Sequence, residues 1–478
     1  MNKKELIGRK KEAAILQEAL NSNESELISV IGRRRVGKTF LVQSAYAGEI
    51  DFEITGIQKA SKQEQLENFA IALNLYAKTS LPVSRPNTWM EAFRLLILYL
   101  EGKDKNRKRV VFFDELPWLA SHRSGFLKAF GFFWNSWAVK NDVVVVICGS
   151  AASWMIRKVV QNKGGLYNRI TKRINLKPFT LQEAELFLHS RNVKFDRYQI
   201  AELYMVTGGI PHYLKEIQAG ESVAQNIDRI CFNPSSGLLF DEFDQLYPSL
   251  FDHAENHIAI IRALASKHSG LTRSEILRIT KLSNGGGFSK TLEELLQSDF
   301  ISEYFPLGKR KRDTLYRLTD EYSLFYLKFI EKLKKEGIGI WENYYQTPAY
   351  KAWSGYAFES ISLKHLPQIK KALGISGVFS THSSFYHKGE DGMPGCQIDL
   401  LIDRNDRVIN LCEIKFANSE FIISKAYAQE LRRKVTLFKH YSKTKKQIFL
   451  TFITTYGILS NQYSTGLVDR ELTLNDLF

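Results

Sequence analysis

A glycine-rich loop near the start of the chain combines residue types that can hold phosphate groups. The loop consists of Gly32, Arg33, Arg34, Arg35, Val36, Gly37, Lys38 and Thr39, and Phe40 follows it. In such a loop the backbone N–H groups surround the phosphates, and the positive end of a following helix adds favourable charge. The Lys38 ammonium would reach the outer phosphates of a nucleoside triphosphate, and the Thr39 hydroxyl would ligate Mg²⁺.

The segments on either side of the loop fit this chemistry. Residues 27–31 are an apolar run of the length of a buried strand, and residues 40–45 can continue as a helix. Strand, loop and helix in this order are the context of a phosphate-binding P-loop.

Two carboxylates follow a second apolar run, residues 110–113, which Arg109 precedes. The run predicts a buried parallel strand with Asp114 and Glu115 at its carboxyl end. Beside a P-loop, Asp114 would hold the Mg²⁺ shell and Glu115 would polarise the attacking water. The alternative is that both acids only cap the next helix.

A third apolar run, residues 143–148, ends in Gly149 and Ser150. The basic segment after it offers an arginine finger for the γ-phosphate on a neighbouring subunit. Arg169 is the first choice for the finger and Arg173 the second. A solvated basic turn would have the same sequence.

Six segments in order resemble the archaeal-type ATPases of the AAA+ and STAND groups: IGRKKEAAIL, GRRRVGKT, VVFFDELPWL, VVVVICGS, LYNRITKRINLKPF and GGIPHYL. The resemblance implies that ATP is the nucleotide and that Ile7, Gly8 and Arg9 lie on its adenine side. It also implies that Ser150 takes the sensor-1 position, between the P-loop and the water. Pro211 would belong to the turn that closes a helical lid over the nucleotide.

Residues 255–320 alternate helical patterns with a β-hairpin, which is a winged-helix pattern. Thr272 is the type of residue that caps a helix, and the three glycines 285–287 predict a turn. The tip of the wing carries Lys309, Arg310, Lys311 and Arg312. These charges predict contacts with DNA phosphates, although a solvated turn or a protein-contact module is the alternative.

The C-terminal part contains a second group of residues with metal chemistry. Residues 396–403 and 408–415 predict two strands joined by a short polar turn, and a helix beginning at Trp353 precedes them. Residues two apart share a face of a strand, so Glu413 and Lys415 project together, and the hairpin can bring Asp399 beside them. Two carboxylates and a lysine can bind Mg²⁺ and activate water for phosphodiester cleavage.

Residues 340–478 resemble the PD-(D/E)XK nuclease superfamily. Glu359, Asp399, Glu413 and Lys415 match its pattern one by one, and Gln429 is a further match in the following helix. The motif's proline is absent, since Ile398 precedes Asp399. The resemblance implies Mg²⁺ or Mn²⁺ held by Glu359, Asp399 and Glu413; a nuclease-like fold that no longer cuts is the alternative.

Composition limits the classes of partner and compartment. The chain has 478 residues and a formal net charge of +15, which favours an anionic partner such as nucleic acid. The four cysteines are scattered without zinc spacing, which suits a cytoplasmic protein with reduced thiols. No apolar run is long enough to cross a membrane.

The sequence therefore predicts an α/β protein of four parts. These are a P-loop AAA+ core with a parallel sheet (1–180), a helical lid (181–250), a winged helix with a linker helix (251–335) and a PD-(D/E)XK-like domain (336–478). The predicted function is ATP hydrolysis coupled to DNA processing by a homo-oligomer. The alternatives are a STAND-type signalling switch and a nucleotide-binding scaffold without nuclease activity.

Overall fold

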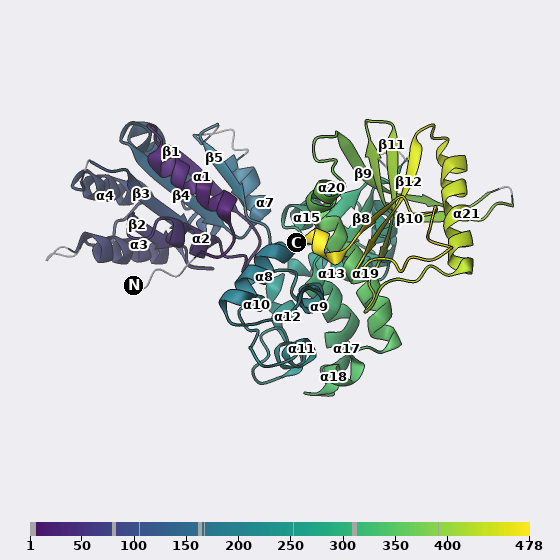
Figure 1. The fold of residues 1–478 in the computed structure, drawn as a ribbon. Coiled ribbons are helices and arrows are strands. Elements are labelled where there is room, and N and C mark those ends of the chain that lie inside the picture. The colour runs from purple at the N-terminus through teal and green to yellow at the C-terminus, as the bar shows by residue number, and fades with distance from the viewer. Residues whose placement is uncertain are drawn as a thin grey trace. The chain divides into compact units, whose positions relative to one another are not determined.

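The computed structural model describes residues 6–78, 83–104, 106–160, 165–166, 168–251, 253–307, 313–390 and 392–478. The chain consists of two compact units, Met1–Pro178 and Phe179–Phe478. In Figure 1 the first unit is drawn in purple to blue, and the second runs from teal to yellow. The predicted basic wing tip, with Lys309 to Arg312, lies outside the described residues.

The first unit is built on a parallel sheet. Its strands are β1 (Glu26–Ile31), β2 (Ile50–Thr55), β3 (Arg109–Asp114), β4 (Val143–Gly149) and β5 (Lys172–Asn175). The order is β2-β3-β4-β1-β5, and every neighbouring pair is parallel. The central strands β1, β3 and β4 are buried along their whole length, as expected for strands covered on both faces. Their carboxyl ends therefore meet at one edge, where the P-loop and the two predicted carboxylates follow.

Helices surround this sheet (Figure 1). They are α1 (Lys10–Asn21), α2 (Lys38–Ala45), α3 (Lys62–Ala77), α4 (Trp89–Glu101), α5 (Leu116–Leu119), α6 (Phe126–Ser136) and α7 (Ala152–Met155), with a 3₁₀ turn at Ala138–Lys140 and a π-helical turn at Ile156–Val160. Helices α3 and α4 lie on either side of Pro86. Ser61 caps α3 and Thr88 caps α4, so each helix has its own start signal.

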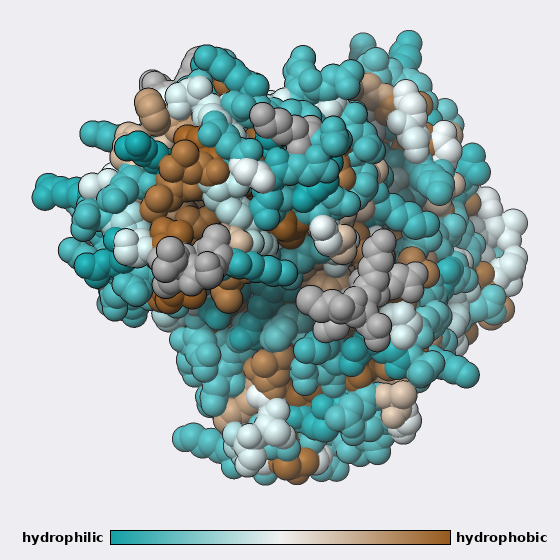
Figure 2. All heavy atoms as spheres, turned by 90° about the vertical axis from the view of Figure 1, so that its left-hand side faces the viewer, coloured by the Kyte–Doolittle hydropathy of each residue, from teal (hydrophilic) through white to brown (hydrophobic). Residues whose placement is uncertain are grey.

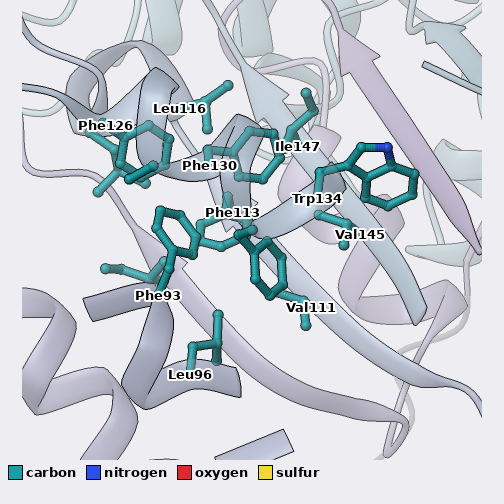
Figure 3. Close-up of a cluster of buried hydrophobic side chains, with 14 of the residues drawn as sticks. Phe93, Leu96, Val111, Phe113, Leu116, Phe126, Phe130, Trp134, Val145 and Ile147 are labelled. Carbon is teal, nitrogen blue, oxygen red and sulfur yellow. The ribbon is translucent and has the colours of Figure 1, made fainter. Parts of the chain in front are cut away.

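An aromatic cluster fixes the central strands of the first unit (Figure 3). The Phe113 ring on β3 lies 5.8 Å from Phe93 on α4, 6.1 Å from Phe126 and 5.5 Å from Phe130, both on α6, between ring centroids. All four rings are buried. Tilted and edge-on rings at these distances pack favourably beyond the area they bury. The cluster therefore holds the end of β3, where Asp114 and Glu115 lie, in a fixed position.

The second unit begins with a group of helices. They are α8 (Leu181–Ser190), α9 (Arg197–Thr207), α10 (Pro211–Leu214), α11 (Val223–Phe232) and α12 (Glu242–Leu246). The predicted sharp turn before Pro211 is present, with φ of 61° at Gly208 and 68° at Gly209. A Cβ atom on Gly209 would lie 2.3 Å from the Phe179 carbonyl oxygen, so only glycine fits there.

A three-stranded antiparallel sheet with three helices follows. The elements are α13 (Ala254–Ala265), β6 (Leu271–Thr272), α14 (Arg273–Thr280), α15 (Gly286–Gln297), β7 (Ile301–Tyr304) and β8 (Leu315–Leu318), with sheet order β6-β8-β7. Thr272 caps α14 in a capping box with Glu275, as its residue type predicted. The three glycines do not all form the turn, because α15 already begins at Gly286. The first turn of a helix tolerates them, since its N–H groups need no partner within the helix.

A helical run and a long helix lead into the last part of the second unit. The elements are α16 (Glu321–Phe325), a π-helical turn (Tyr326–Ile330), α17 (Glu331–Leu333), α18 (Ile340–Tyr344), α19 (Pro348–Lys364) and α20 (Leu366–Ala372). The helix predicted from Trp353 starts earlier, at Pro348. Thr347 caps it and proline occupies a first-turn position, where its missing N–H costs nothing.

The last sheet is mixed, with the order β13-β12-β11-β10-β9. Its strands are β9 (Ser380–His387), β10 (Cys396–Arg404), β11 (Val408–Lys415), β12 (Gln447–Thr454) and β13 (Arg470–Leu472), with α21 (Lys425–Ser442) between β11 and β12 and a 3₁₀ turn at Leu474–Leu477. β9, β10 and β11 are antiparallel neighbours, whereas β11, β12 and β13 run parallel. The predicted hairpin of residues 396–403 and 408–415 is thus present.

The surface shown in Figure 2 is largely hydrophilic, with apolar side chains gathered in a few patches. Among the described residues, no helix combines the length and the apolar character that a membrane span requires.

Candidate functional sites

The loop between β1 and α2 has a backbone conformation that requires glycine at two positions, Gly32 and Gly37. A Cβ atom on Gly32 would lie 2.4 Å from the carbonyl oxygen of Leu176, so a larger residue would push the loop off the strand edge. Gly37 has a φ of 90° and Arg35 a φ of 71°. Positive φ at two positions bends the chain tightly just before α2, which aims backbone N–H groups into the space that the loop encloses.

Lys38, the first residue of α2, is buried at 6% exposure. Its ammonium donates to the carbonyl oxygens of Gly32 at 2.9 Å and Arg33 at 3.0 Å, and to Ser150 Oγ at 2.8 Å. Burial lowers the pKa of Lys38, and the negative charge of Glu115 opposes that shift. The loop therefore holds a desolvated cation that gains from an anionic ligand.

Thr39 and Asp114 form a second contact at the same edge. The Thr39 hydroxyl donates to Asp114 Oδ2 at 2.7 Å. Burial raises the pKa of Asp114, and the hydrogen bond from Thr39 opposes that rise. A hydroxyl and a carboxylate side by side are the oxygen ligands that Mg²⁺ prefers, so this pair fits the predicted magnesium site.

Ser150 connects Lys38 to Glu115. Its hydroxyl donates to Glu115 Oε1 at 2.5 Å while it accepts from Lys38, and its backbone N–H donates to Glu115 Oε2 at 3.1 Å. Glu115 has a φ of 45°, a left-handed conformation that is uncommon for non-glycine residues. Lys38, Ser150 and Glu115, which were predicted separately, thus form one chain of hydrogen bonds. They follow the carboxyl ends of β1, β4 and β3, respectively.

The other residues predicted around the nucleotide lie in different surroundings. Arg9 is 5% exposed, and its guanidinium donates to the Val36 carbonyl oxygen at 3.2 Å, so the segment of Ile7, Gly8 and Arg9 leads onto the loop. Phe40 is exposed on α2, and Arg34 is partly buried. Pro211 begins α10 in the second unit, and its contact with the nucleotide stays a prediction.

The two finger candidates lie at the edge of the first sheet. Arg173 is exposed on β5, the edge strand next to β1, and Arg169 is exposed just before it. An arginine finger must be exposed to reach another subunit, but an arginine in a solvated turn is exposed as well. The finger role of Arg169 or Arg173 therefore stays a prediction.

The second candidate site lies on the β10–β11 hairpin. Leu400 pairs with Cys412, so the same register sets Asp399 opposite Glu413. The pairing of β10 with β9 is irregular between Ile398 and Leu401, which is where Asp399 lies. The Lys415 ammonium is 3.6 Å from Glu413 Oε2. The hairpin therefore brings together Asp399, Glu413 and Lys415 as the alternation of the strands predicted.

Other cations already engage the carboxylates of this site. Lys434 forms an ion pair with Glu413 Oε1, and the Tyr427 hydroxyl donates to Glu413 Oε2 at 3.1 Å. Arg317 on β8 lies 3.8 Å from Glu359 Oε2. Burial raises the pKa of Glu359 to about 8, and the charge of Asp399 adds to the rise.

The role of Glu359, Asp399 and Glu413 as a three-carboxylate metal set stays a prediction. Within the ranges that the structure describes, no three His, Cys, Asp or Glu side chains lie close enough to hold a metal ion. In the described conformation the Lys434 ammonium forms an ion pair with Glu413, and the Arg317 guanidinium lies 3.8 Å from Glu359.

Sequence reasoning missed the residues that contact these carboxylates. Tyr427 and Lys434 are seven residues apart on α21, two turns of a helix, so the helical period would have placed them on one face. Gln429, the residue that the motif suggested, is exposed. Arg317 comes from a distant strand, and nothing in the local sequence links it to Glu359.

A strand–loop–helix at the carboxyl edge of a parallel sheet, with Lys38, Thr39 and Asp114 together, defines a P-loop NTPase fold. Residues 6–217 match the family described as an ATPase domain predominantly from Archaea. The match supports an archaeal-type P-loop ATPase domain in this part of the chain, with binding and hydrolysis of ATP.

The chain also resembles individual proteins. It is 24% identical over 461 residues to an uncharacterised protein of Methanocaldococcus jannaschii, covering 92% of this chain and 96% of that one. Among solved structures, a Walker-type ATPase of Pyrococcus abyssi is 20% identical, with a TM-score of 0.49 and coverage of 68% of this chain and 96% of that one. The ORC2 protein of Aeropyrum pernix, in ADPNP–ADP complexes, is 16% identical, with a TM-score of 0.42. The match covers 70% of this chain and 95% of that one.

Proposed function

We propose that the protein couples ATP hydrolysis in its first unit to the processing of DNA by its second unit. The observation that carries the proposal is the hydrogen-bond chain from Lys38 through Ser150 to Glu115, beside the Thr39–Asp114 pair. It gathers the groups that phosphoryl transfer needs at one edge of the sheet: a phosphate-binding cation, a metal-binding pair and a base.

Each residue then has a role in hydrolysis. Lys38 exchanges its contacts for the outer phosphates of ATP, and Thr39 and Asp114 hold Mg²⁺, which would neutralise charge on those phosphates. Glu115 orients and polarises the attacking water once Ser150 no longer holds both of its carboxylate oxygens. Arg169, or Arg173 in its place, would supply a finger to the neighbouring subunit of a homo-oligomer.

The second unit would carry the work on DNA. Residues 181–250 would form the lid with Pro211, and residues 251–335 a winged helix whose wing contacts DNA phosphates. The element order from α13 to β8 and the three-stranded sheet support the winged helix. The net charge of +15 supports a polyanionic partner.

Residues 336–478 would be the nuclease-like domain. The opposed Asp399 and Glu413, with Lys415 beside them, support this assignment. In the described conformation Lys434 forms an ion pair with Glu413 Oε1, the carboxylate oxygen other than the one beside Lys415.

A signalling switch of the STAND type is the second candidate function. One observation favours it: both carboxylate oxygens of Glu115 are engaged by Ser150, which withholds the base from water. Such a protein would turn over ATP slowly, once per activation, and its C-terminal domain would be an effector or a binding platform.

One set of assays separates these functions. ATP turnover and DNA cleavage are measured on duplex, single-stranded and branched DNA with Mg²⁺ or Mn²⁺. Coupled processing predicts DNA-stimulated steady turnover, and Asp399→Ala or Lys415→Ala abolishes cleavage while ATP turnover persists. Single slow turnovers would support the switch. If the wild-type protein cleaves no DNA form with either metal, the nuclease assignment is withdrawn.

A further inference from the structure

A cavity in the second unit has a basic, aromatic lining that includes no residue of the P-loop. It measures about 380 Å³, within the range of small-ligand pockets. Its walls come from the end of α13, strand β8, the helical run from α16 to α17, and α19. None of its residues has a role in the proposed hydrolysis of ATP.

Cations dominate the wall of this cavity. Arg262, Lys267, Arg317, Lys328 and Lys332 line it, and Glu331 is the acidic residue among them. Arg262 donates to Glu331 at 3.0 Å, so that carboxylate is already compensated. Lys328 and Lys332 are exposed at the wall, and the charge of Lys332 helps to lower the pKa of Glu331.

Arg317 supplies a buried donor on the inner side. It is 9% exposed, and its guanidinium donates to Ser360 Oγ at 3.1 Å. A guanidinium has five N–H donors in a planar fork, which matches the oxygens of a phosphate. Burial lowers the pKa of His268, and the positive charges of Arg317 and Lys328 lower it further. These two charges therefore make the surroundings of His268 positive.

Aromatic side chains line another part of the wall. The His268 and Tyr356 rings stack at 4.3 Å between centroids with an angle of 9°, and Trp353 is buried beside them. Tyr356 is 44% exposed, so part of its ring is open to a ligand. Flat rings beside cations are the combination that binds a nucleobase and its phosphate.

The backbone of the cavity wall is unusual as well. Leu327 and Lys328 lie in the π-helical turn Tyr326–Ile330, which interrupts the run from α16 to α17. Such turns are rare, and they occur frequently at functional sites because they re-aim side chains at the cost of regular hydrogen bonding. This feature is independent of the charges and aromatic rings.

From these observations we infer that the cavity binds a phosphate-bearing nucleotide. Lys328, Lys332 and Arg317 contact the phosphate, and the face of Tyr356 stacks on the base. The ligand is a free mononucleotide or the terminal nucleotide of a DNA strand, which share this chemistry. The inference goes beyond the proposed function, because it requires neither ATP hydrolysis nor DNA cleavage.

The test uses the full-length protein with Lys38→Ala, which removes binding at the P-loop. Calorimetric titrations with AMP, with ATP and with a 5′-phosphorylated DNA hexamer compare three versions of this protein. The first has an intact cavity, the second adds Lys328→Gln and Lys332→Gln, and the third adds Tyr356→Leu. Lys371→Gln with Lys439→Gln is the control, because both lysines are exposed in the same unit and neither lines the cavity.

We expect the double cavity variant and Tyr356→Leu each to weaken binding by about tenfold or more, because each removes contacts to phosphate or base. The control should stay within about twofold. Preference for AMP and ATP would identify a free nucleotide, and preference for the hexamer a strand end. Absence of binding to the Lys38→Ala protein, or equal losses in the control, would overturn the inference. Because no turnover is measured, failure of the proposed ATPase or nuclease would not affect this result.

Discussion

Replacing Lys38 by alanine tests whether the loop after β1 is the nucleotide site. In the wild-type protein the Lys38 ammonium is the buried cation of that loop, held by two carbonyl oxygens and Ser150. Without it, the phosphates of ATP would lose this cation, and we expect binding of ATP at this loop to be abolished.

The size of the effect follows from ligand linkage. A ligand that binds only the folded state, present at 100 times its dissociation constant, stabilises that state by about 2.7 kcal/mol. The first unit spans Met1–Pro178, and for domains of this size 1 kcal/mol raises the melting temperature by roughly 2–4 °C. ATP should therefore raise the melting temperature of this unit by about 5–11 °C in the wild-type protein.

The assay is thermal unfolding with and without Mg²⁺–ATP, comparing each variant with itself. This comparison removes any change that the substitution causes in the nucleotide-free protein, where Lys38→Ala also deletes three hydrogen bonds. Glu115→Gln is the matched control, because it should keep the ATP-induced shift and lose hydrolysis. A full ATP-induced shift of the first unit's melting temperature in the Lys38→Ala protein would refute the assignment of the loop.

Further predictions concern the base Glu115, the two candidate finger arginines, the charges of the wing and the buried His365. Glu115→Gln should lower ATP turnover by about 10²–10⁴-fold in a phosphate-release assay, and wild-type turnover would remove its role as base. Arg169→Ala or Arg173→Ala should lower turnover and its dependence on protein concentration, whereas unchanged rates in both variants would exclude a finger in trans. Neutralising Lys309, Arg310, Lys311 and Arg312 should reduce the salt dependence of DNA binding by about one slope unit for each phosphate that the wing no longer neutralises; an unchanged slope contradicts binding of phosphates by the wing. Stability of the second unit should fall by up to about 3 kcal/mol as the pH drops from 6.5 towards 4, because burial lowers the pKa of His365 to about 4 and the unfolded chain binds its proton first; His365→Gln should flatten this dependence in denaturation curves.

The elements that carry the site in the first unit were predictable because they have local signals. Apolar runs marked β1, β3 and β4, and the glycines at 32 and 37 marked a loop whose backbone excludes a Cβ atom or needs positive φ. What the sequence could not show is that Ser150 joins Lys38 to Glu115. Both contacts depend on the strand order β3-β4-β1. That order brings Ser150 to Lys38, 112 positions earlier in the chain, and to Glu115, 35 positions earlier.

In the second unit, too, local patterns predicted positions along the strands but not the contacts made by distant residues. The alternation of the hairpin predicted that Glu413 and Lys415 share a face, because it depends on a two-residue period and a short turn. It could not show that Lys434 neutralises Glu413, since that contact depends on the placement of α21 against the sheet. The predicted carboxylates are therefore placed largely as expected, while the cations around them were not predictable.

Arg317 connects the two features of the second unit that local sequence could not predict. Its guanidinium lies in the wall of the cavity, donates to Ser360, and is 3.8 Å from the Glu359 carboxylate. A phosphate in the cavity would compete with Glu359 for this one charge, because a guanidinium between two anions is shared by both. Drawing Arg317 towards the phosphate would leave Glu359 with less compensation for its burial, which disfavours its ionised form. A ligand in the cavity would therefore change the charge balance beside Asp399 and Glu413 without touching either residue.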